Sequence, residues 1–336
     1  MPLPDGLDPA SQGGGARAPA TYTPRGLRGS RAIRTAAWTV LAAGVTAPLV
    51  RRRLRLSAPA VGVVSGAAPI ALCVLRPRTR ARDVATCCLQ MWAYIALYQM
   101  PHDDPGALER RVHVDYPVRV DSLLGLGALP TLRLQRWLAR PGRITRFDRL
   151  LIWVHWIWFL TPHAALAYIL VRRRDMFTRA ATLMYAVFDL GLIGYWALPT
   201  APPWYAAQRG RIEGDDMPAL RRVMYEHGEQ FWEDGWQPLY DFLGGNPLAA
   251  MPSLHFATSV MAAHLLSEVG RPAAVVGWSY AITLCLALVY LGEHYVIDLV
   301  AGLALTEGIR RAAAPVTPLT VRVSRCVQVL EARAAG

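Results

Sequence analysis

Long apolar segments recur along this sequence, and they constrain the fold more than any other feature. A transmembrane helix needs about 20 mostly apolar residues. Eight segments meet or approach that length: 36–50, 58–75, 84–100, 150–171, 178–198, 253–269, 273–292 and 296–312. A single buried helix of a soluble protein cannot account for so many, and 53% of all residues are hydrophobic. We therefore predict an all-α integral membrane protein, built as a helical bundle.

The positive charge of the chain stands beside these segments. The formal net charge is +12, and the basic residues are arginines in short runs. Arginine concentrates at the cytoplasmic ends of membrane spans and attracts anionic lipid. No motif of a nucleic-acid-binding module accompanies it, so the charge indicates a membrane partner rather than a nucleic acid.

The arginine runs also predict an orientation. With a cytoplasmic N-terminus most runs fall inside, while the loop 199–251, which is rich in Glu and Asp, falls outside. Two groups resist this orientation: the arginines of 51–55 and those between Arg110 and Arg149. We expect a multi-pass protein of the cell membrane with both termini cytoplasmic.

The same segments divide the chain into regions. We expect a disordered basic cytoplasmic tail, an N-terminal transmembrane hairpin, a catalytic transmembrane core and a second cytoplasmic tail. In that order the regions are 1–34, 35–83, 84–312 with outer loops 101–149 and 199–251, and 313–336. Within the first outer loop, apolar and Arg residues alternate at helical spacing over 130–138, which predicts a helix lying on the membrane surface. The five cysteines lack metal-ligand or disulfide spacing, and we interpret them as small core residues.

One group of candidate residues opens the segment that begins at 253. Pro252 suits a first helical turn and Ser253 suits a helix cap, and His255 follows them. The backbone N–H groups of a helix start can hold an anion. A histidine at such a position is more often an interfacial residue than a catalytic one, so this motif alone is weak.

A second group opens the last apolar segment. His294 and Asp298 are four residues apart, so on a helix they share a face and the carboxylate can bond one ring nitrogen. That bond fixes the imidazole tautomer. An Asp inside an apolar segment is costly unless it is paired, which favours a functional role over a polar helix cap.

The predicted orientation brings the two groups together. His255 and His294 both begin spans from the outer side, so they lie at one depth. Two imidazoles and one carboxylate suit covalent phosphoryl transfer, in which one His attacks phosphorus and the other protonates the leaving oxygen.

These motifs resemble those of the type 2 phosphatidic acid phosphatase superfamily, over about residues 84–312. Pro252, Ser253 and His255 match its P-S-G-H motif, with Leu254 at the glycine position, and His294 with Asp298 matches its H-x3-D motif. The resemblance implies a six-helix core, here with about two extra N-terminal spans. It also implies that His294 is the nucleophile, Asp298 its orienting partner and His255 the general acid.

The sequence departs from the phosphatases at their phosphate-binding cations. Leu288 replaces an expected Arg, and a Pro-rich segment, 198–205, stands where K-x6-R-P would lie. These departures resemble the inositol phosphorylceramide synthase branch and its bacterial relatives, which carry P-S-L-H and H-Y-x-x-D motifs. That resemblance adds Tyr295 to Pro252 and Ser253 as substrate-binding candidates.

A cation must still neutralise charge on phosphorus. The second outer loop offers four candidates: Arg209, Arg211, Arg221 and Arg222. We take Arg209 and Arg211 as substrate-binding residues. For any single arginine of the four, the simpler interpretation is that it belongs to a solvated connecting loop of mixed charge.

Inside the spans, His155 and His163 are expected to form interhelical hydrogen bonds, and Asp189 needs a partner that its sequence neighbours do not supply.

The sequence therefore predicts a membrane enzyme of this superfamily. The leading hypothesis is transfer of a phosphoinositol-type head group from a phospholipid donor to a lipid or glycolipid hydroxyl, at the extracytoplasmic face and without a metal ion or cofactor. The alternative within the superfamily is a phosphatase acting on a phosphatidic or polyprenyl phosphate. The alternative of another class is a proton-coupled transporter or flippase, whose relay groups would be spread through the membrane. Imidazoles more than about 10 Å apart would count against the enzyme.

Overall fold

The chain folds into a bundle of helices. The structure is a computed structural model and describes residues 25–212, 220–244 and 246–335. Within these residues the regular elements are α- and 3-10 helices, and β pairing is limited to isolated bridges. Together with the apolar helices described next, this confirms the predicted all-α membrane fold.

Among the helices of the described residues, four are long and apolar enough to cross a membrane. A fifth candidate is a pair of helices, α7 and α8, bent by 61° at a short break. The four are α1 (Arg25–Leu54), α2 (Ala58–Leu75), α9 (Arg174–Ala197) and α14 (Arg271–Tyr290), and the bent pair is α7 (Arg146–Trp156) with α8 (Leu160–Arg172). The segment 150–171, predicted as one continuous span, is thus broken.

The remaining three predicted spans are helices that fall short of the length or composition of a lipid-facing span. They are α3 (Arg80–Gln99), α13 (Leu254–Val269) and α15 (Val296–Ala335). Helix α13 has only 16 residues and packs against α8, α9, α14 and α15. Because its neighbours cover it, α13 does not need the length of a helix that faces lipid. The predicted count of eight spans is therefore reduced to four or five by length and composition.

Both predicted tails contain helix. Helix α1 begins at Arg25, inside the region 1–34 that was expected to be disordered, and residues 1–24 lie outside the described residues. Helix α15 continues without interruption to Ala335, so the region 313–336 extends the last predicted span rather than following it as a separate tail.

All five cysteines are free. Cys88 and Cys326 are exposed, so the prediction that the cysteines are core residues is wrong for these two.

The N-terminal helices α1 and α2 fold back on each other. They approach closely at Gly44, where an added Cβ would lie 2.6 Å from the Cβ of Ala68. At the end of α1, Arg51 and Arg52 form ion pairs with Asp103 at 3.0 Å and 2.6 Å. The turn between α1 and α2 therefore lies on the same side of the bundle as the start of the loop 101–149.

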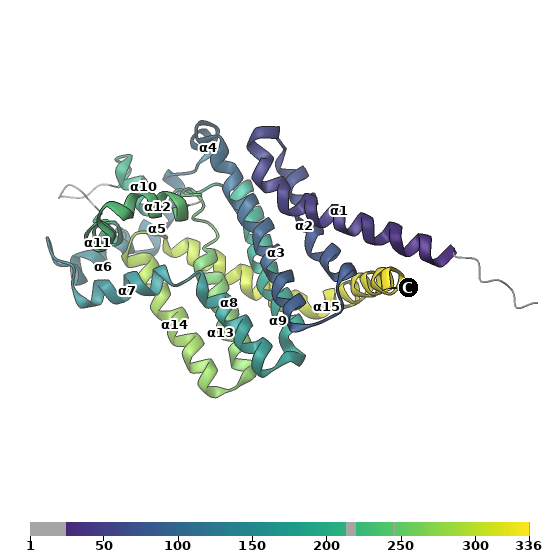
Figure 1. Ribbon diagram of the computed structural model, residues 1–336. Helices are drawn as coiled ribbons and strands as arrows, with labels where there is room; N and C mark the ends of the chain where they lie inside the picture. Colours follow the sequence, from purple (N-terminus) through teal and green to yellow (C-terminus); the bar gives the residue numbers. More distant parts are fainter. Residues whose placement is uncertain (1–24, 213–219, 245, 336) are drawn as a thin grey trace, which may run out of the picture.

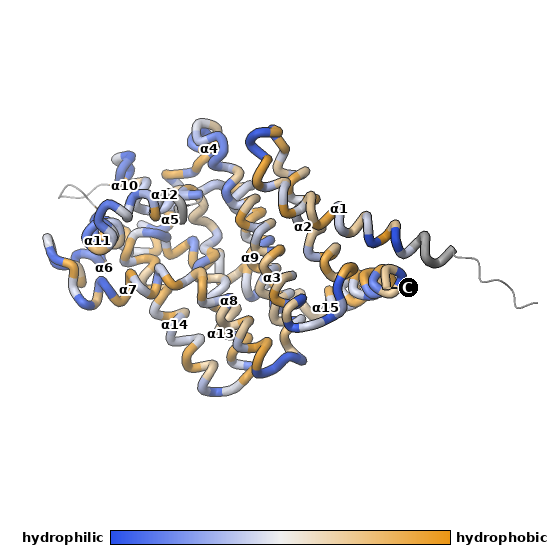
Figure 2. The backbone as a smooth tube through the Cα atoms, in the orientation of Figure 1, coloured by the Kyte–Doolittle hydropathy of each residue, from blue (hydrophilic) through white to orange (hydrophobic). Residues whose placement is uncertain are grey.

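Short helices from the two predicted outer loops gather at one end of the bundle (Figure 1). Figure 2 shows hydrophilic segments concentrated there and at turns, whereas the long helices are mostly apolar. These short elements are η1 (Met100–Asp103), α4 (Pro105–Arg111), α5 (Asp115–Leu124), α6 (Pro130–Leu138), α10 (Pro203–Gln208), α11 (Val223–Trp232), η2 (Glu233–Gly235) and α12 (Trp236–Gly244). The predicted helix over 130–138 is confirmed as α6.

Candidate active site

The two histidines singled out in the sequence are in direct contact. His255 Nδ1 lies 3.1 Å from His294 Nε2, and the ring centroids are 5.1 Å apart. His255 stands in the first turn of α13, whereas His294 lies in the turn between α14 and α15. The separation is well below the 10 Å that would have counted against shared chemistry on one phosphorus.

Asp298 holds the other nitrogen of His294. Its Oδ2 lies 3.3 Å from His294 Nδ1 and accepts the backbone N–H of Tyr295 at 2.9 Å. The carboxylate is fully buried, and its Oδ1 has no hydrogen-bond partner among the described residues. The predicted pairing is present, but its geometry differs from the prediction. Helix α15 begins at Val296, so Asp298 reaches back over the helix start instead of bonding along a helix face.

Backbone contacts fix the two helix starts against each other. The Ser253 N–H donates to the Asp298 carbonyl at 2.9 Å, and the Ser253 hydroxyl accepts the N–H of Phe256 and caps α13. A Cβ at Gly302 of α15 would lie 2.6 Å from the Ser253 carbonyl oxygen. Ser253, predicted to bind substrate, is therefore fully buried in the joint between these helices.

The motif before His255 rests on two glycines of α9. A Cβ at Gly194 would lie 2.6 Å from Pro252 Cδ, and a Cβ at Gly191 would lie 2.3 Å from Leu254 Cδ2. Leu254 is 1% exposed. The leucine at the position where the phosphatases have glycine thus fills the space that Gly191 leaves on the opposite helix.

Asp121 of α5 caps the helix that carries Asp298, a role the sequence did not reveal. Its two carboxylate oxygens accept the N–H groups of Val296 and Ile297, both at 3.0 Å. Burial raises the pKa of the Asp121 carboxyl, and the two N–H donors oppose that change. An anion at the N-terminus of α15 satisfies donors that would otherwise be unpaired, and so holds the start of the helix in place.

A third imidazole lies against His255. The rings of His155 and His255 stack with centroids 5.0 Å apart and an angle of 22° between planes, and Trp158 packs against the same histidine at 4.0 Å. Both ring nitrogens of His155 are buried and have no partner among the described residues. The expected interhelical hydrogen bond of His155 is therefore wrong. His163 bonds the carbonyl of Phe159, within its own segment.

Three of the four candidate arginines are occupied by carboxylates. Each ion pair joins the arginine to a different acidic residue. The pairs are Arg209 with Glu109 at 3.0 Å, Arg211 with Asp115 at 3.6 Å, and Arg221 with Glu226 at 2.5 Å. The first two pairs are about half exposed, so both predicted substrate-binding arginines lie at the solvent-facing surface of the outer loops.

Arg222 has different surroundings. Its guanidinium lies 4.4 Å from the centre of the Trp204 ring and donates to the Tyr240 hydroxyl at 2.8 Å, and no carboxylate forms an ion pair with it in the described parts of the chain. Burial raises the pKa of the Glu293 carboxyl, whereas Arg222, His294 and the Trp204 side chain oppose that rise. Arg222 is therefore within electrostatic reach of the residue next to His294.

The Pro-rich segment that replaces the first phosphatase motif is bonded to the stretches of chain that precede the two histidines, through Thr200 before the Met251–Pro252 bond and through Trp204, whose N–H donates to the Gly292 carbonyl. Thr200 pairs through its backbone with His113 and with Ala249, two residues before the Met251–Pro252 bond. The Thr200 hydroxyl also contacts the Tyr116 hydroxyl at 2.9 Å. Tyr295 is fully buried in an apolar cluster that includes Trp204 of this segment, and its hydroxyl has no partner among the described residues.

Asp189, the buried acid of α9, has a partner from another helix. Both of its carboxylate oxygens accept from the Gln90 side chain of α3, at 3.0 and 2.9 Å. Its role in the described structure is to join these two helices.

In the same described residues no group of three His, Cys, Asp or Glu side chains is arranged to hold a metal ion.

Comparison with known proteins agrees with this arrangement. Residues 117–310, more than half of the chain, match the sequence profile of the PAP2 superfamily. The chain belongs to the PAP2 superfamily. The matched range contains Asp121, His155, His255, His294 and Asp298.

The curated relatives include the inositol phosphorylceramide synthase catalytic subunit aur1 of Schizosaccharomyces pombe. It is 30% identical over 121 residues, which are 34% of this chain and 27% of the relative. The chain thus spans about a quarter of that protein's length. No solved structure matches the chain. The resemblance to the superfamily is confirmed, and with it the predicted enzyme class of phosphatase or phosphotransferase. The fission yeast relative agrees with the predicted inositol phosphorylceramide synthase branch over the part of it that the chain matches.

Proposed function

We propose that this chain moves a phosphoinositol-type head group from a phospholipid to a hydroxyl of a lipid or glycolipid, through a phosphohistidine on His294. The observation that carries the proposal is the 3.1 Å contact between His255 Nδ1 and His294 Nε2 beside the buried carboxylate of Asp298. A nucleophile, a proton carrier and an orienting acid stand within reach of one phosphorus atom.

In the first step His294 Nε2 attacks the phosphorus of the donor lipid. The N–P bond forms as the bond between phosphorus and the glycerol oxygen breaks, and the departing oxygen takes a proton from His255. Asp298 accepts a hydrogen bond from the N–H at Nδ1 of His294. It thereby keeps the Nδ1 proton in place and stabilises the positive charge that the ring gains. The head group is then attached to His294 and diacylglycerol is free.

In the second step the acceptor hydroxyl attacks the same phosphorus. Its proton passes to His255, the new P–O bond forms and the N–P bond breaks. Both imidazoles return to their starting protonation states, so the cycle needs no further acid or base.

We assign the phosphate-binding cation to Arg222. It is the candidate arginine without a carboxylate ion pair in the described residues, and it lies within electrostatic reach of Glu293, the neighbour of His294. Arg209 and Arg211, the residues favoured by the sequence, would first have to leave their carboxylate partners. A phosphodiester carries about one negative charge, against up to two on a monoester, so one cation suffices.

The choice of head-group transfer over phosphate removal has two supports. The phosphatase cations are absent from the sequence, since Leu288 and the Pro-rich segment occupy their positions. The fission yeast relative is named as an inositol phosphorylceramide synthase. Hydrolysis of a phosphatidic or polyprenyl phosphate uses the same three residues with water as acceptor, and it is the second candidate.

The transporter hypothesis receives less support from the geometry. A proton relay requires groups spread through the depth of the membrane. Here His255, His294 and Asp298 contact one another at the start of two helices.

We place this site on the extracytoplasmic side of the cell membrane. The orientation conflicted with the arginines at the end of α1, yet Arg51 and Arg52 both pair with Asp103 of the loop assigned to that side. The single carboxylate of Asp103 offsets one of these two positive charges, which reduces the conflict and supports the assignment.

The test supplies purified protein with phosphatidylinositol labelled in the head group, with and without an acceptor lipid. We expect a labelled lipid product that depends on the acceptor, and no product from His294→Ala. The matched control is His264→Ala, a histidine on the same helix as His255. Release of free inositol phosphate or phosphate without acceptor would indicate hydrolysis instead. Turnover by His294→Ala equal to that of the unaltered protein would exclude the proposed nucleophile.

A further inference from the structure

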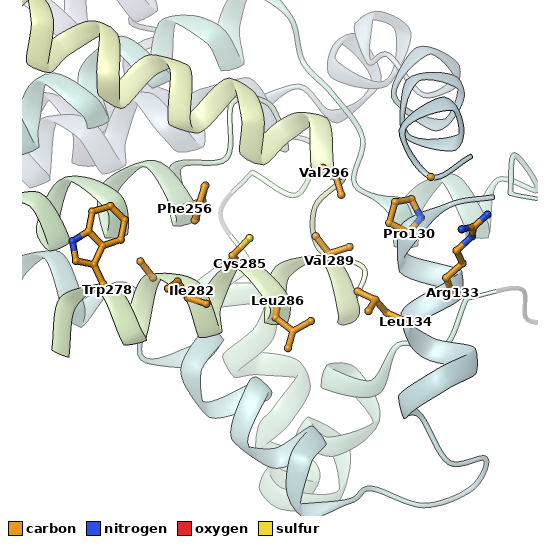
Figure 3. Close-up of a pocket in the computed structure, with 12 residues that line it drawn as sticks. Pro130, Arg133, Leu134, Phe256, Trp278, Ile282, Cys285, Leu286, Val289 and Val296 are labelled. Atoms are coloured by element: carbon orange, nitrogen blue, oxygen red, sulfur yellow. The ribbon is translucent and has the colours of Figure 1, made fainter. Parts of the chain in front are cut away.

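A long apolar groove runs along α14 next to the histidine pair. It has a volume of about 620 Å³ and lies between α6, α13, α14 and the start of α15 (Figure 3). In Figure 3, Trp278 and Ile282 stand at one end of the groove, and Pro130 and Arg133 stand at the other. Its volume is in the range of sites that bury small ligands.

The groove shares its walls with the site. Phe256, which lines it, follows His255 in the first turn of α13, and Val296, which also lines it, is the first residue of α15 and donates its N–H to Asp121. Because consecutive residues of a helix point about 100° apart, His255 and Phe256 face adjacent sides of the same turn. A ligand in the groove therefore lies on the side of this turn adjacent to the side that carries His255.

The chemistry of the groove is that of a lipid tail with a charged end. Its walls are apolar except at Arg133, whose guanidinium donates to the carbonyl of Leu126 at one end of α6. From Trp278 to Val289 the wall extends over twelve residues of α14, or about 16 Å along the helix axis. Exposed apolar side chains on the same helix, Val275 and Val276, mark its face toward lipid.

We propose that this groove holds a hydrocarbon chain of the anionic phospholipid donor, with the head group at the end nearest Arg133 and the histidine pair. The proposal rests on the proposed function and names the path by which its substrate reaches the site from the bilayer. A hydrocarbon chain that is already in the bilayer gains little free energy from an apolar wall, because the surrounding lipid tails are equally apolar. Selection therefore comes from the head group, and the groove aligns the chain.

A second apolar groove provides a matched comparison within the same molecule. It has a volume of about 760 Å³ and lies among α1, α2 and α3, lined by Cys88 and Arg80 among others. It too combines apolar walls with one arginine, but its lining contains none of the residues next to the histidines. A lipid that fills grooves without selection would occupy both.

The experiment uses phosphatidylinositol with a photoreactive diazirine in one acyl chain, bound to the full chain carrying His294→Ala so that the lipid is not consumed. Irradiation and mass spectrometry then locate the adducts. We expect adducts on α14 between Trp278 and Val289. Excess unlabelled phosphatidylinositol should reduce them at least fivefold, whereas phosphatidylcholine and glycerophosphoinositol should not. Adducts at Cys88 and its neighbours should decrease equally with either phospholipid. Equal competition by both phospholipids at α14, or no adduct there, would overturn the proposal.

A second measurement separates failure of the groove from failure of the function. Cys285→Trp fills the groove, and Ala85→Trp fills the second one. We expect Cys285→Trp to raise KM at least fivefold for a long-chain donor while a dihexanoyl donor is used as before, and Ala85→Trp to change neither. An unchanged ratio between the two donors would contradict the groove. If the unaltered protein transfers no head group at all, the proposed function fails, whereas the adduct map still decides whether the groove binds the lipid.

Discussion

A contact between a histidine and a carboxylate occurs at two levels where α13 packs against α15. At the first level the groups are His255, His294 and Asp298. Nine residues further along each helix, about 14 Å away by helix rise, His264 Nε2 lies 2.8 Å from Glu307 Oε1. The same types of side chain on the same two helices therefore form two sites that differ in their surroundings.

The difference lies in burial and in the third partner. The side chains of His294 and Asp298 are 3% and 0% exposed, whereas those of His264 and Glu307 are 20% and 28% exposed. At the second level Arg310 donates to Glu307 at 2.9 Å and lies 3.1 Å from His264 Nε2. That arginine neutralises the carboxylate and contacts the same ring nitrogen that Glu307 contacts, whereas Asp298 and His255 contact different nitrogens of His294. At the first level a second imidazole stands in its place. A histidine beside an acid is thus not sufficient for the proposed chemistry.

Removing the nucleophile should separate the two levels most clearly. We expect His294→Ala to lower head-group transfer by about 10⁴-fold, because no other group can form the covalent intermediate. His264→Ala should leave the rate within about twofold. The measurement is the initial rate of labelled product with each purified variant. Equal losses from both variants would mean that the comparison does not reflect catalysis.

The orienting acid should have the next largest effect. Asp298→Asn keeps the shape of the side chain but cannot hold the Nδ1 proton of His294, so we expect kcat to decrease by about 10²- to 10⁴-fold. Glu307→Gln at the second level serves as the control and should retain kcat. A modest loss in Asp298→Asn, within about fivefold, would show that the carboxylate is only a structural cap for Tyr295.

Replacing the arginines tests which cation neutralises the phosphate charge at the first level. Arg222→Ala should lower kcat/KM by about 10²-fold, comparable to the loss of one donor to a developing negative charge. Arg209→Ala and Arg211→Ala should change it little, because both side chains are exposed and paired with Glu109 and Asp115. A reversed order would return the assignment to the two arginines that the sequence favoured.

The smallest effect is expected at His155, which touches His255 through its ring face. His155→Ala should reduce kcat by up to about tenfold, in line with the 0.5–1.5 kcal/mol of an aromatic pair. His155→Phe keeps the stacking and should stay within about threefold of the unaltered rate. If the Phe variant is as impaired as the Ala variant, the unpartnered nitrogens of His155 contact the substrate, and its role is larger than stacking.

The sequence was sufficient for the parts of the site that depend on short spacing. The segments of α2, α9 and α14 follow from their apolar residues, and the contact of His294 with Asp298 follows from their separation of four. The contact between His255 and His294 needed one further inference, that both open spans from the same side.

Contacts between distant segments could not be predicted in this way. Asp121 caps α15 across 175 positions of the chain, and His155 stacks on His255 from another helix. Neither spacing nor composition marks Asp121, and His155 stands out in the sequence only as a polar residue inside a span, without any sign of its partner. The break between α7 and α8 does have a signal in the sequence: Pro162 has no N–H to donate to the carbonyl of Trp158, as a continuous helix would require, and proline is accepted in the first turn of α8.

The most direct test of the central claim is to trap the covalent intermediate. The protein would be mixed with phosphatidylinositol labelled in the head group, without acceptor, and quenched at alkaline pH to preserve a phosphorus–nitrogen bond. Mass spectrometry would then locate the label. We expect one inositol phosphate on His294, present in His264→Ala and absent in His294→Ala. Label on another residue, or label that persists in His294→Ala, would contradict the account.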